Sequence, residues 1–434
     1  MVARLFIKCK MCDSITLLRY QVGYGNIQIV IPCGNCGCEL RGRCIQDDEN
    51  VSLSFSFENA ELVAEQQADF VAQYSRELLS KKVEPYSIEA EFALSPFMSM
   101  SQIFMQHGDQ SSRVQRAMHF VDEDLPAADD IFDLAALWGN NRLDVLYQKL
   151  NNMIPECPIE NKNHLQIGTR IHHLIISLIS PLLPRRWKEE INFFPLLSKL
   201  IKTHSTQMVE CAKYFEGKNF LSTSEIALTG EIKKFLKIVP NILPAFAFCD
   251  DMRSKKELHE RGMFSISFDE LKTYYQNSFE IIASCCDCLI ALNNIYHRGD
   301  FMTLPIVVGD IKTLNDLEKS RSKIKKVETF LPPDEEFSKL LAMPLHSHIR
   351  NAIGHTSVTY DPLTQLISFE DKHKGKIRVE QIYLTEFANM CIENFCTLVY
   401  LLETVYQLRK FIFIENGDVP DLNYTRLILS EKLP

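Results

Sequence analysis

Two groups of side chains in this sequence have types and spacings suited to chemistry. The first is a pair of Cys-x-x-Cys motifs near the N-terminus, Cys9 with Cys12 and Cys33 with Cys36, separated by twenty residues. A Cys-x-x-Cys turn directs two sulfur atoms at one ion, and four thiolates satisfy tetrahedral zinc. Because such a site has no open coordination position, we expect one structural Zn²⁺ rather than a catalytic ion.

Two further cysteines lie close to this group, Cys38 and Cys44. We expect both to be ordinary small side chains near the site. The spacing also leaves open a ligand exchange between Cys36 and Cys38. The alternative for the whole group is unligated thiols, which the doubled motif disfavours.

The chain between the two motifs reads as two strands, residues 15–22 and 27–31, around a turn at residues 23–26. A hairpin between paired cysteine turns resembles a zinc ribbon, which we place at residues 1–46. Basic side chains outnumber acidic ones in this segment. Zinc ribbons bind nucleic acid or protein, and the sequence does not decide between them.

The second group lies far along the chain, around Arg350, Asn351 and His355. On a helix, Ser347, Asn351 and His355 follow one another at spacings of four and share a face, and Arg350 is long enough to reach it. A cation, an amide, a hydroxyl and an imidazole would then converge. The alternative is a helix whose C-terminal histidine simply interacts with the helix dipole.

Two more histidines precede this group, His346 and His348. Side chains two positions apart on a helix point in different directions. We therefore expect His346 and His348 to face solvent or the rim of the site rather than to bind a metal.

Long helices must position the second group. Apolar residues recur at spacings of three and four over residues 266–297 and again from 384 to 405, which predicts two long helices packed in a bundle. Strands are expected at 356–360 and 365–369, joined by a turn. We expect five cysteines to lie in the bundle core as small hydrophobic residues: Cys285, Cys286, Cys288, Cys391 and Cys396.

The pattern Arg350-Asn351-x-x-x-His355 resembles the motif of the HEPN ribonuclease family, and the resemblance extends over about residues 256–415. It implies metal-independent cleavage of RNA, in which the 2′-hydroxyl attacks the phosphodiester. His355 would be the acid and base, Arg350 would stabilise the phosphate, and Asn351 would orient His355 or the phosphate. The family further implies a homodimer with two motifs facing each other, and a role as a toxin or antiviral-defence effector.

Other polar residues near the motif are weaker candidates for contacts with RNA. Ser347 shares the predicted helix face. A basic run follows the predicted hairpin and could contact the RNA backbone, although such runs are more often simply solvated: Lys372, Lys374, Lys376 and Arg378.

Length and composition limit the remaining possibilities. A chain of 434 residues with 46% hydrophobic residues predicts about two to four folded domains. The net charge of −9 excludes a generic binder of nucleic acid, so any contact must use a local patch. The absence of an apolar leader predicts a cytoplasmic protein with no membrane segment, and the scattered distribution of the 14 Cys favours reduced thiols.

The middle of the chain carries little functional signal. We expect a strand at 51–57, a helix at 60–80 and a strand at 87–94, and then helices at 131–153, 165–182 and 187–215. His172 and His173 lie in an apolar helix pattern, where burial explains them without catalysis. Their role is predicted to be structural.

The predicted architecture is mainly α: a zinc ribbon at 1–46, an α+β segment at 47–130, a helical domain at 131–255 and a HEPN-like helical domain at 256–434. The predicted activity is an RNA endonuclease, controlled by a partner protein or a phage-derived trigger. Two alternatives stay open. The HEPN-like bundle could be a non-catalytic dimerisation scaffold, or the zinc ribbon could be a sensor of nucleic acid or protein.

Overall fold

A computed structural model describes residues 2–23, 26–47, 52–106, 110–159, 163–183, 193–247, 259–320, 329–332, 334–340, 346–373 and 376–429. The chain forms two units, each assembled from three separate segments. Unit 1 contains Met1–Glu123, Leu236–Gln276 and His346–Ile392, and unit 2 contains Asp124–Phe235, Asn277–Leu345 and Glu393–Pro434. The four domains predicted from the sequence stay a prediction.

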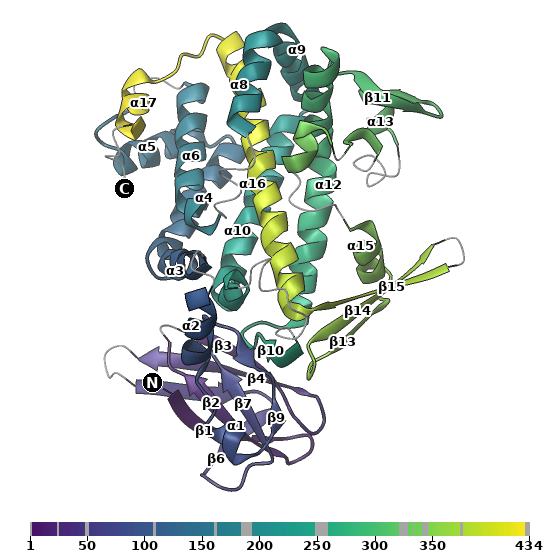
Figure 1. Ribbon diagram of the computed structural model, residues 1–434. Helices are drawn as coiled ribbons and strands as arrows, with labels where there is room; N and C mark the ends of the chain where they lie inside the picture. Colours follow the sequence, from purple (N-terminus) through teal and green to yellow (C-terminus); the bar gives the residue numbers. More distant parts are fainter. Residues whose placement is uncertain are drawn as a thin grey trace. The chain divides into compact units, whose positions relative to one another are not determined.

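Two β-sheets form the N-terminal part of unit 1 (Figure 1). One has the strand order β6-β1-β2-β7-β9, with β1 (Val2–Cys9), β2 (Ile15–Gln21), β6 (Ala60–Val63), β7 (Phe70–Tyr74) and β9 (Glu84–Pro85). Strands β1 and β2 are antiparallel, whereas β2 and β7 are parallel. The other sheet has the order β3-β4-β5, with β3 (Ile27–Pro32), β4 (Glu39–Asp47) and β5 (Ser52–Phe57).

The two sheets share one hydrophobic core. The first sheet contributes Ile7, Leu18 and Tyr74, and the second contributes Ile29 and Leu40, all buried in the same cluster. A hydrogen bond from the Tyr74 hydroxyl to the carbonyl of Gln28, 2.6 Å long, also joins the sheets. This core also contains side chains of β5 and β7, which both lie beyond residue 46.

The structure corrects three predictions for this region. The two strands predicted at 15–22 and 27–31 are present as β2 and β3. The prediction that they pair as a hairpin is wrong, because β2 pairs with β1 and β7 while β3 pairs with β4. The helix at 60–80 is wrong, since strands β6 and β7 occupy that stretch. Residues 87–94 are not a strand: the short helix α1 (Ile88–Glu91) begins there, capped by the Ser87 side chain. The predicted strand at 51–57 is confirmed as β5.

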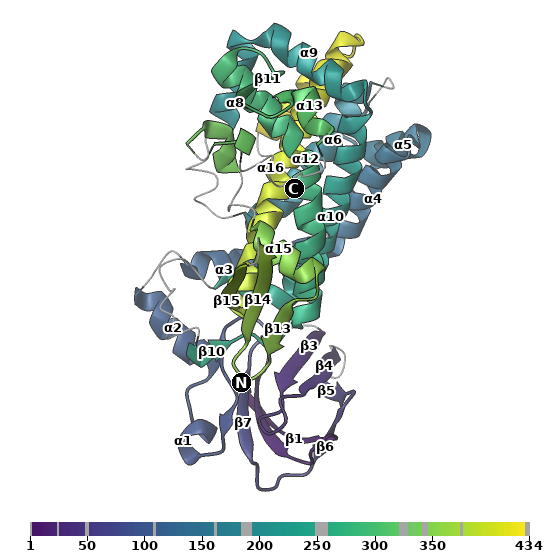
Figure 2. The same cartoon turned by 90° about the vertical axis from the view of Figure 1, so that its right-hand side faces the viewer.

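Helices and two further small sheets complete unit 1. Helices α2 (Pro96–Gln106) and α3 (Gln110–His119) follow the N-terminal sheets, and β8 (Ser80–Lys81) pairs with β10 (Arg261–Gly262). A three-stranded sheet has the order β13-β14-β15, with β13 (Val358–Asp361), β14 (Leu366–His373) and β15 (Lys376–Tyr383). Its first two strands confirm the predicted hairpin. Helix α15 (Ser347–Gly354) packs against β14 (Figure 2).

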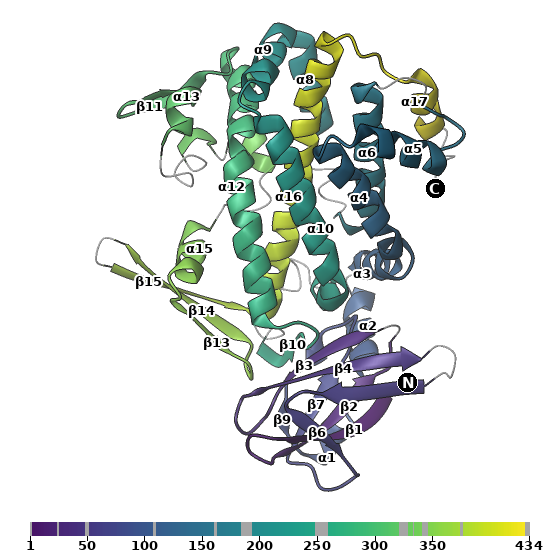
Figure 3. The same ribbon diagram turned by 180° about the vertical axis from the view of Figure 1, so that it is seen from behind.

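Unit 2 is mainly helical. Helices α4, α5 and α6 pack on one another (Figure 3). The helices that lie wholly in this unit are α4 (Ala128–Gly139), α5 (Leu143–Met153), α6 (His164–Ile179), α8 (Phe193–Thr203), α9 (Ser205–Glu216), α13 (Leu314–Glu318) and α17 (Leu422–Leu429). It also holds the hairpin of β11 (Thr303–Val308) and β12 (Ile311–Thr313). Short turns of other helix types in this unit are η2 (Leu125–Ala127), η3 (Ser180–Leu182) and η5 (Glu336–Leu340). Another such turn, η1 (Phe120–Asp124), lies where unit 1 ends and unit 2 begins.

Three long helices contribute residues to both units: α10 (Phe220–Phe246), α12 (Phe268–Arg298) and α16 (Leu384–Glu415). The helices predicted from residues 266 and 384 are thus confirmed, and the five cysteines expected in their core are buried. The predicted helix at 131–153 is two helices, α4 and α5, with a break in which Asn141 has a φ of 53°. The helix at 165–182 is confirmed as α6 and η3. Residues 193–215 form α8 and α9, and residues 187–192 lie outside the described chain.

Helices make up 57% of the structure, and with the N-terminal sheets the fold is mixed α/β rather than mainly α. Within the described residues, α12 is the one helix long and apolar enough to span a bilayer, and 83% of its most apolar stretch is buried. A core helix of a globular protein has the same properties.

Candidate metal centre and candidate active site

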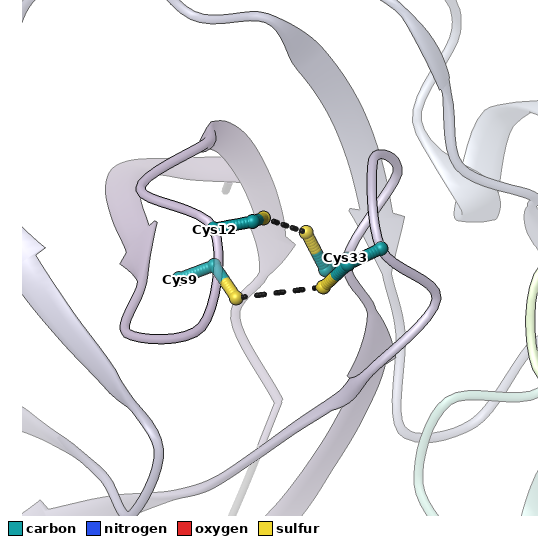
Figure 4. A group of neighbouring side chains, drawn as sticks. Cys9, Cys12 and Cys33 are labelled. Atoms are coloured by element: carbon teal, nitrogen blue, oxygen red, sulfur yellow. Dashed lines mark hydrogen bonds between the residues drawn. The ribbon is translucent and has the colours of Figure 1, made fainter.

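The four cysteines of the two motifs come together in unit 1 (Figure 4). Cys9 is the last residue of β1, and Cys12 lies in the turn that leads to β2. Cys33 follows β3 directly, and Cys36 lies in the turn that leads to β4. Each motif therefore belongs to a different sheet, and an ion bound between them would link the two sheets.

The two turns have the same backbone geometry. The N–H of Asp13 donates to the carbonyl of Cys9 at 3.0 Å, and the N–H of Gly37 donates to the carbonyl of Cys33 at 2.9 Å. Both donors have a positive φ, 58° for Asp13 and 70° for Gly37. Glycine adopts this conformation without strain, and aspartate tolerates it better than most residues.

The sulfur atoms have the separations that a tetrahedral ion requires. All four Sγ atoms lie within 4.8 Å of one another. The distance from Cys9 to Cys36 is 3.9 Å and that from Cys12 to Cys33 is 3.5 Å. Zn–S bonds of ~2.3 Å place the sulfur atoms of a tetrahedral site about 3.8 Å apart. The four thiols form a plausible metal site, whose thiolate donors suit zinc.

Cys12, Cys33 and Cys36 have shifted pKa values. A hydrogen bond from the backbone of Ser14 is the main reason that the pKa of Cys12 falls to about 7. Burial raises the pKa of Cys33 to about 12 and also raises that of Cys36. Of these three thiols Cys12 ionises first, and a bound cation would supply the charge that deprotonates Cys33 and Cys36.

The surplus cysteines have other surroundings. The Cys38 thiol lies 3.4 Å from the amide nitrogen of Asn59 and 3.8 Å from the carbonyl of Glu39. Cys44 is buried in the core of the two sheets, where burial raises its pKa. The structure thus favours Cys36 over Cys38 as the fourth metal ligand.

The second group of residues lies on α15, at the end of unit 1 that holds the β13-β14-β15 sheet. Ile349, Ala352 and Ile353 bury one face of the helix, and Arg350 and Asn351 are half-buried beside it. The buried face fixes the helix on the sheet, and the exposed residues Gly354 and His355 lie at its C-terminal end.

His355 occupies the C-cap of α15 and is exposed. Its N–H donates to the carbonyl of Asn351 at 2.8 Å, and the next residue, Thr356, has a positive φ of 55° that turns the chain away. The Arg350 guanidinium extends toward the same end, because Nη1 lies 3.9 Å from where a Cβ on Gly354 would be. Arg350 and His355 are thus at the same end of one short helix.

In the predicted basic run, Lys372 lies on β14 and Arg378 on β15, and these two side chains do not share one face. Lys372 is paired with Ile377, whereas Arg378 is paired with Asp371 on the other side of the sheet. Cross-strand partners lie on the same face of a sheet, so Lys372 and Arg378 point to opposite faces. Lys374 lies outside the described residues, as does the side chain of Lys376.

Sequence reasoning missed one cluster. One donor atom each of His346, His348 and Glu380 lies within 4.8 Å of the others. The expectation that the histidines point apart is wrong, because His346 is the N-cap of α15, with a non-helical backbone, and only His348 is helical. No local pattern could have found Glu380, which lies on β15.

The histidines of unit 2 have structural surroundings. Nε2 of His172 lies 2.5 Å from a carboxylate oxygen of Glu403, and its ring stacks on Tyr406. Nδ1 of His173 lies 3.1 Å from the hydroxyl of Tyr424. Both rings have protein partners, as their predicted structural role requires.

No protein-family model, curated protein or solved structure matches the chain. No family is assigned to it, and the likeness to HEPN ribonucleases rests on residues 350–355 and the elements around them.

Proposed function

We propose that the chain is an RNA endonuclease whose active site contains Arg350, Asn351 and His355. The observation that carries the proposal is the placement of Arg350 and His355 at one end of α15, with His355 exposed. A guanidinium and an accessible imidazole on a fixed helix end are the two groups that cleavage of RNA by its own 2′-hydroxyl requires.

In the proposed reaction, His355 takes the proton of the 2′-hydroxyl while that oxygen attacks phosphorus. The bond from phosphorus to the 5′-oxygen breaks, and the leaving oxygen receives a proton from an imidazolium. The products carry a 2′,3′-cyclic phosphate and a 5′-hydroxyl. Arg350 neutralises the negative charge that grows on the phosphoryl oxygens. The half-buried Asn351 orients the imidazole or the phosphate.

The proton given to the leaving group comes from a second His355, in the homodimer that the resemblance implies. Each chain offers one such imidazole at the C-cap of α15. A composite site supplies a base and an acid at once, which a single imidazole does not. Ser347, Lys372, Lys374, Lys376 and Arg378 are proposed to contact the RNA, with Lys372 and Arg378 doing so from different faces of the sheet.

We also propose that Cys9, Cys12, Cys33 and Cys36 hold a structural Zn²⁺. The support is the fit of the sulfur separations to a tetrahedral site. Four thiolates leave no position for a substrate or water, so the ion has no part in cleavage. We also propose that the protein acts in the cytoplasm as a toxin or defence effector. A partner protein or a phage-derived trigger would release its nuclease activity.

The test is RNA cleavage by the purified protein with and without EDTA. The proposal predicts cleavage that persists in EDTA, products with 2′,3′-cyclic ends, and no cleavage of a substrate with 2′-deoxynucleotides. Circular dichroism of the same samples shows that the chain is still folded. A folded dimer that leaves RNA intact would instead support the dimerisation scaffold, and salt-dependent binding without cleavage would support the sensor.

A further inference from the structure

The side chains of His346, His348 and Glu380 form a second set of metal-type donors in unit 1, separate from the cysteines. His346 lies immediately before α15, His348 lies in its first turn, and Glu380 lies on β15. Nε2 of His348 forms a hydrogen bond with Oε2 of Glu380. The packing of α15 on the β13-β14-β15 sheet brings the three donors together.

His346 supplies a second observation. Its Nε2 is buried and has no hydrogen-bond partner within the part of the chain that the structure describes. A buried polar atom left without a partner costs stability. A bound cation with an imidazole ligand removes that cost.

We infer that His346, His348 and Glu380 bind a divalent transition-metal ion of the Zn²⁺ class. Two imidazoles and one carboxylate are a ligand set of zinc enzymes and of other first-row ions. Nitrogen and oxygen donors ~2.0–2.2 Å from an ion lie about 3 to 4 Å apart. Donors already within 4.8 Å of one another reach that spacing by side-chain rotation.

The two metal sites differ in what they can bind besides the ion. The cysteine set fills a tetrahedron, whereas three protein ligands leave at least one position for water or a small anion. His348 is buried, and Glu380 and His346 are partly exposed. The ion would fasten the start of α15 to β15, two residues before Arg350. This inference does not rest on the proposed ribonuclease function.

Arg378 competes with the ion for the carboxylate. Its Nη2 lies 3.3 Å from Oε2 of Glu380, the oxygen that also contacts His348. The Arg378 side chain is 63% exposed, so it can move away into water when an ion binds. Removal of this positive charge should therefore tighten metal binding.

The test uses the full-length protein and Co²⁺ as the probe. Bound Co²⁺ is counted by elemental analysis after gel filtration, and visible spectra separate the two sites, since only the cysteine site gives thiolate charge-transfer bands. Wild type should hold one equivalent more Co²⁺ than His346→Ala or Glu380→Gln, with unchanged charge-transfer bands. Arg378→Gln should bind Co²⁺ several-fold more tightly.

The matched control is His297→Ala. His297 pairs with Glu336 at 2.7 Å in unit 2, and the described residues place no third donor beside them. This variant should take up as much Co²⁺ as wild type. Equal uptake by wild type, His346→Ala and Glu380→Gln, all with native circular dichroism, would overturn the inference.

Discussion

Cys9 and Cys33 occupy equivalent positions in two turns that belong to different sheets. Each is the first thiol of its motif, and each donates its backbone N–H to the carbonyl five residues ahead, Cys9 to Ser14 at 3.0 Å and Cys33 to Cys38 at 2.8 Å. The two turns are thus copies of one backbone structure that face each other. A single ion between them would hold β1 and β3 together.

Replacing one of these ligands should remove the metal and weaken unit 1. For Cys33→Ser we expect loss of one equivalent of zinc and a loss of stability on the order of several kcal/mol, because metal binding is coupled to folding. Elemental analysis and thermal melts measure both. Cys38→Ser, outside the ligand set, should keep the zinc. Less than half an equivalent in the wild type, or unchanged metal in Cys33→Ser, would contradict the assignment.

The local spacing of the cysteines made this site predictable, since each motif needs only four consecutive residues to form a turn. The surrounding sheet was not predictable in the same way. Strand β2 has its partners in β1 and in β7, and the pairing of Thr16 with Phe70 joins residues far apart in the sequence. Residues 70–74 are mostly buried, so β7 lacks the alternation that identifies a half-exposed strand.

The cluster of His346, His348 and Glu380 illustrates the same limit. The apolar period of residues 266–297 identified α12 because a helix forms from local contacts. The contact between His348 and Glu380 joins residues 32 positions apart, across a helix and two strands. The sequence also does not locate the start of α15, and this start decides whether His346 is helical.

Lys82 should make the stability of unit 1 change with pH in the alkaline range. Its Nζ donates to the carbonyl of Thr364 at 2.6 Å and lies 4.4 Å from the centre of the Tyr383 ring, and burial lowers its pKa to about 8. In the unfolded chain the pKa is about 10.4. The unfolded state therefore binds more protons between these values, so the stability cost of the buried charge is full below about pH 8 and is lost as pH rises from about 8 to about 10.4.

Urea unfolding of wild type and Lys82→Met at several pH values measures this effect. Wild type should gain stability relative to Lys82→Met between about pH 8 and 10.4, because the variant has no proton to lose there. The difference between the two proteins cancels the titration of other groups. Parallel pH profiles would show that Lys82 titrates normally.

His172→Ala should destabilise unit 2 without affecting RNA cleavage. The side chains of His172 and Glu403 are only 9% and 10% exposed. Removal of the imidazole therefore takes the partner from the buried Oε2 of Glu403, while Oε1 keeps the Gln407 amide. Such a loss costs on the order of 3 kcal/mol. Thermal melts measure it, and His173→Ala, whose ring is half-buried, should lose less. If His172→Ala loses cleavage at temperatures where it remains folded, His172 belongs to the chemistry.

RNA cleavage by variants of α15 measures whether Arg350 and His355 form the active site. His355→Ala should lower the rate ~10²–10⁴-fold through loss of the acid and base. Arg350→Ala should lower it ~10²–10³-fold, and Asn351→Ala less than either. His355 is exposed at the C-cap, so its removal should change stability by no more than about 0.5 kcal/mol. We expect His355→Ala to be inactive and normally stable. A destabilised His355→Ala with full activity would show that His355 takes no part in cleavage.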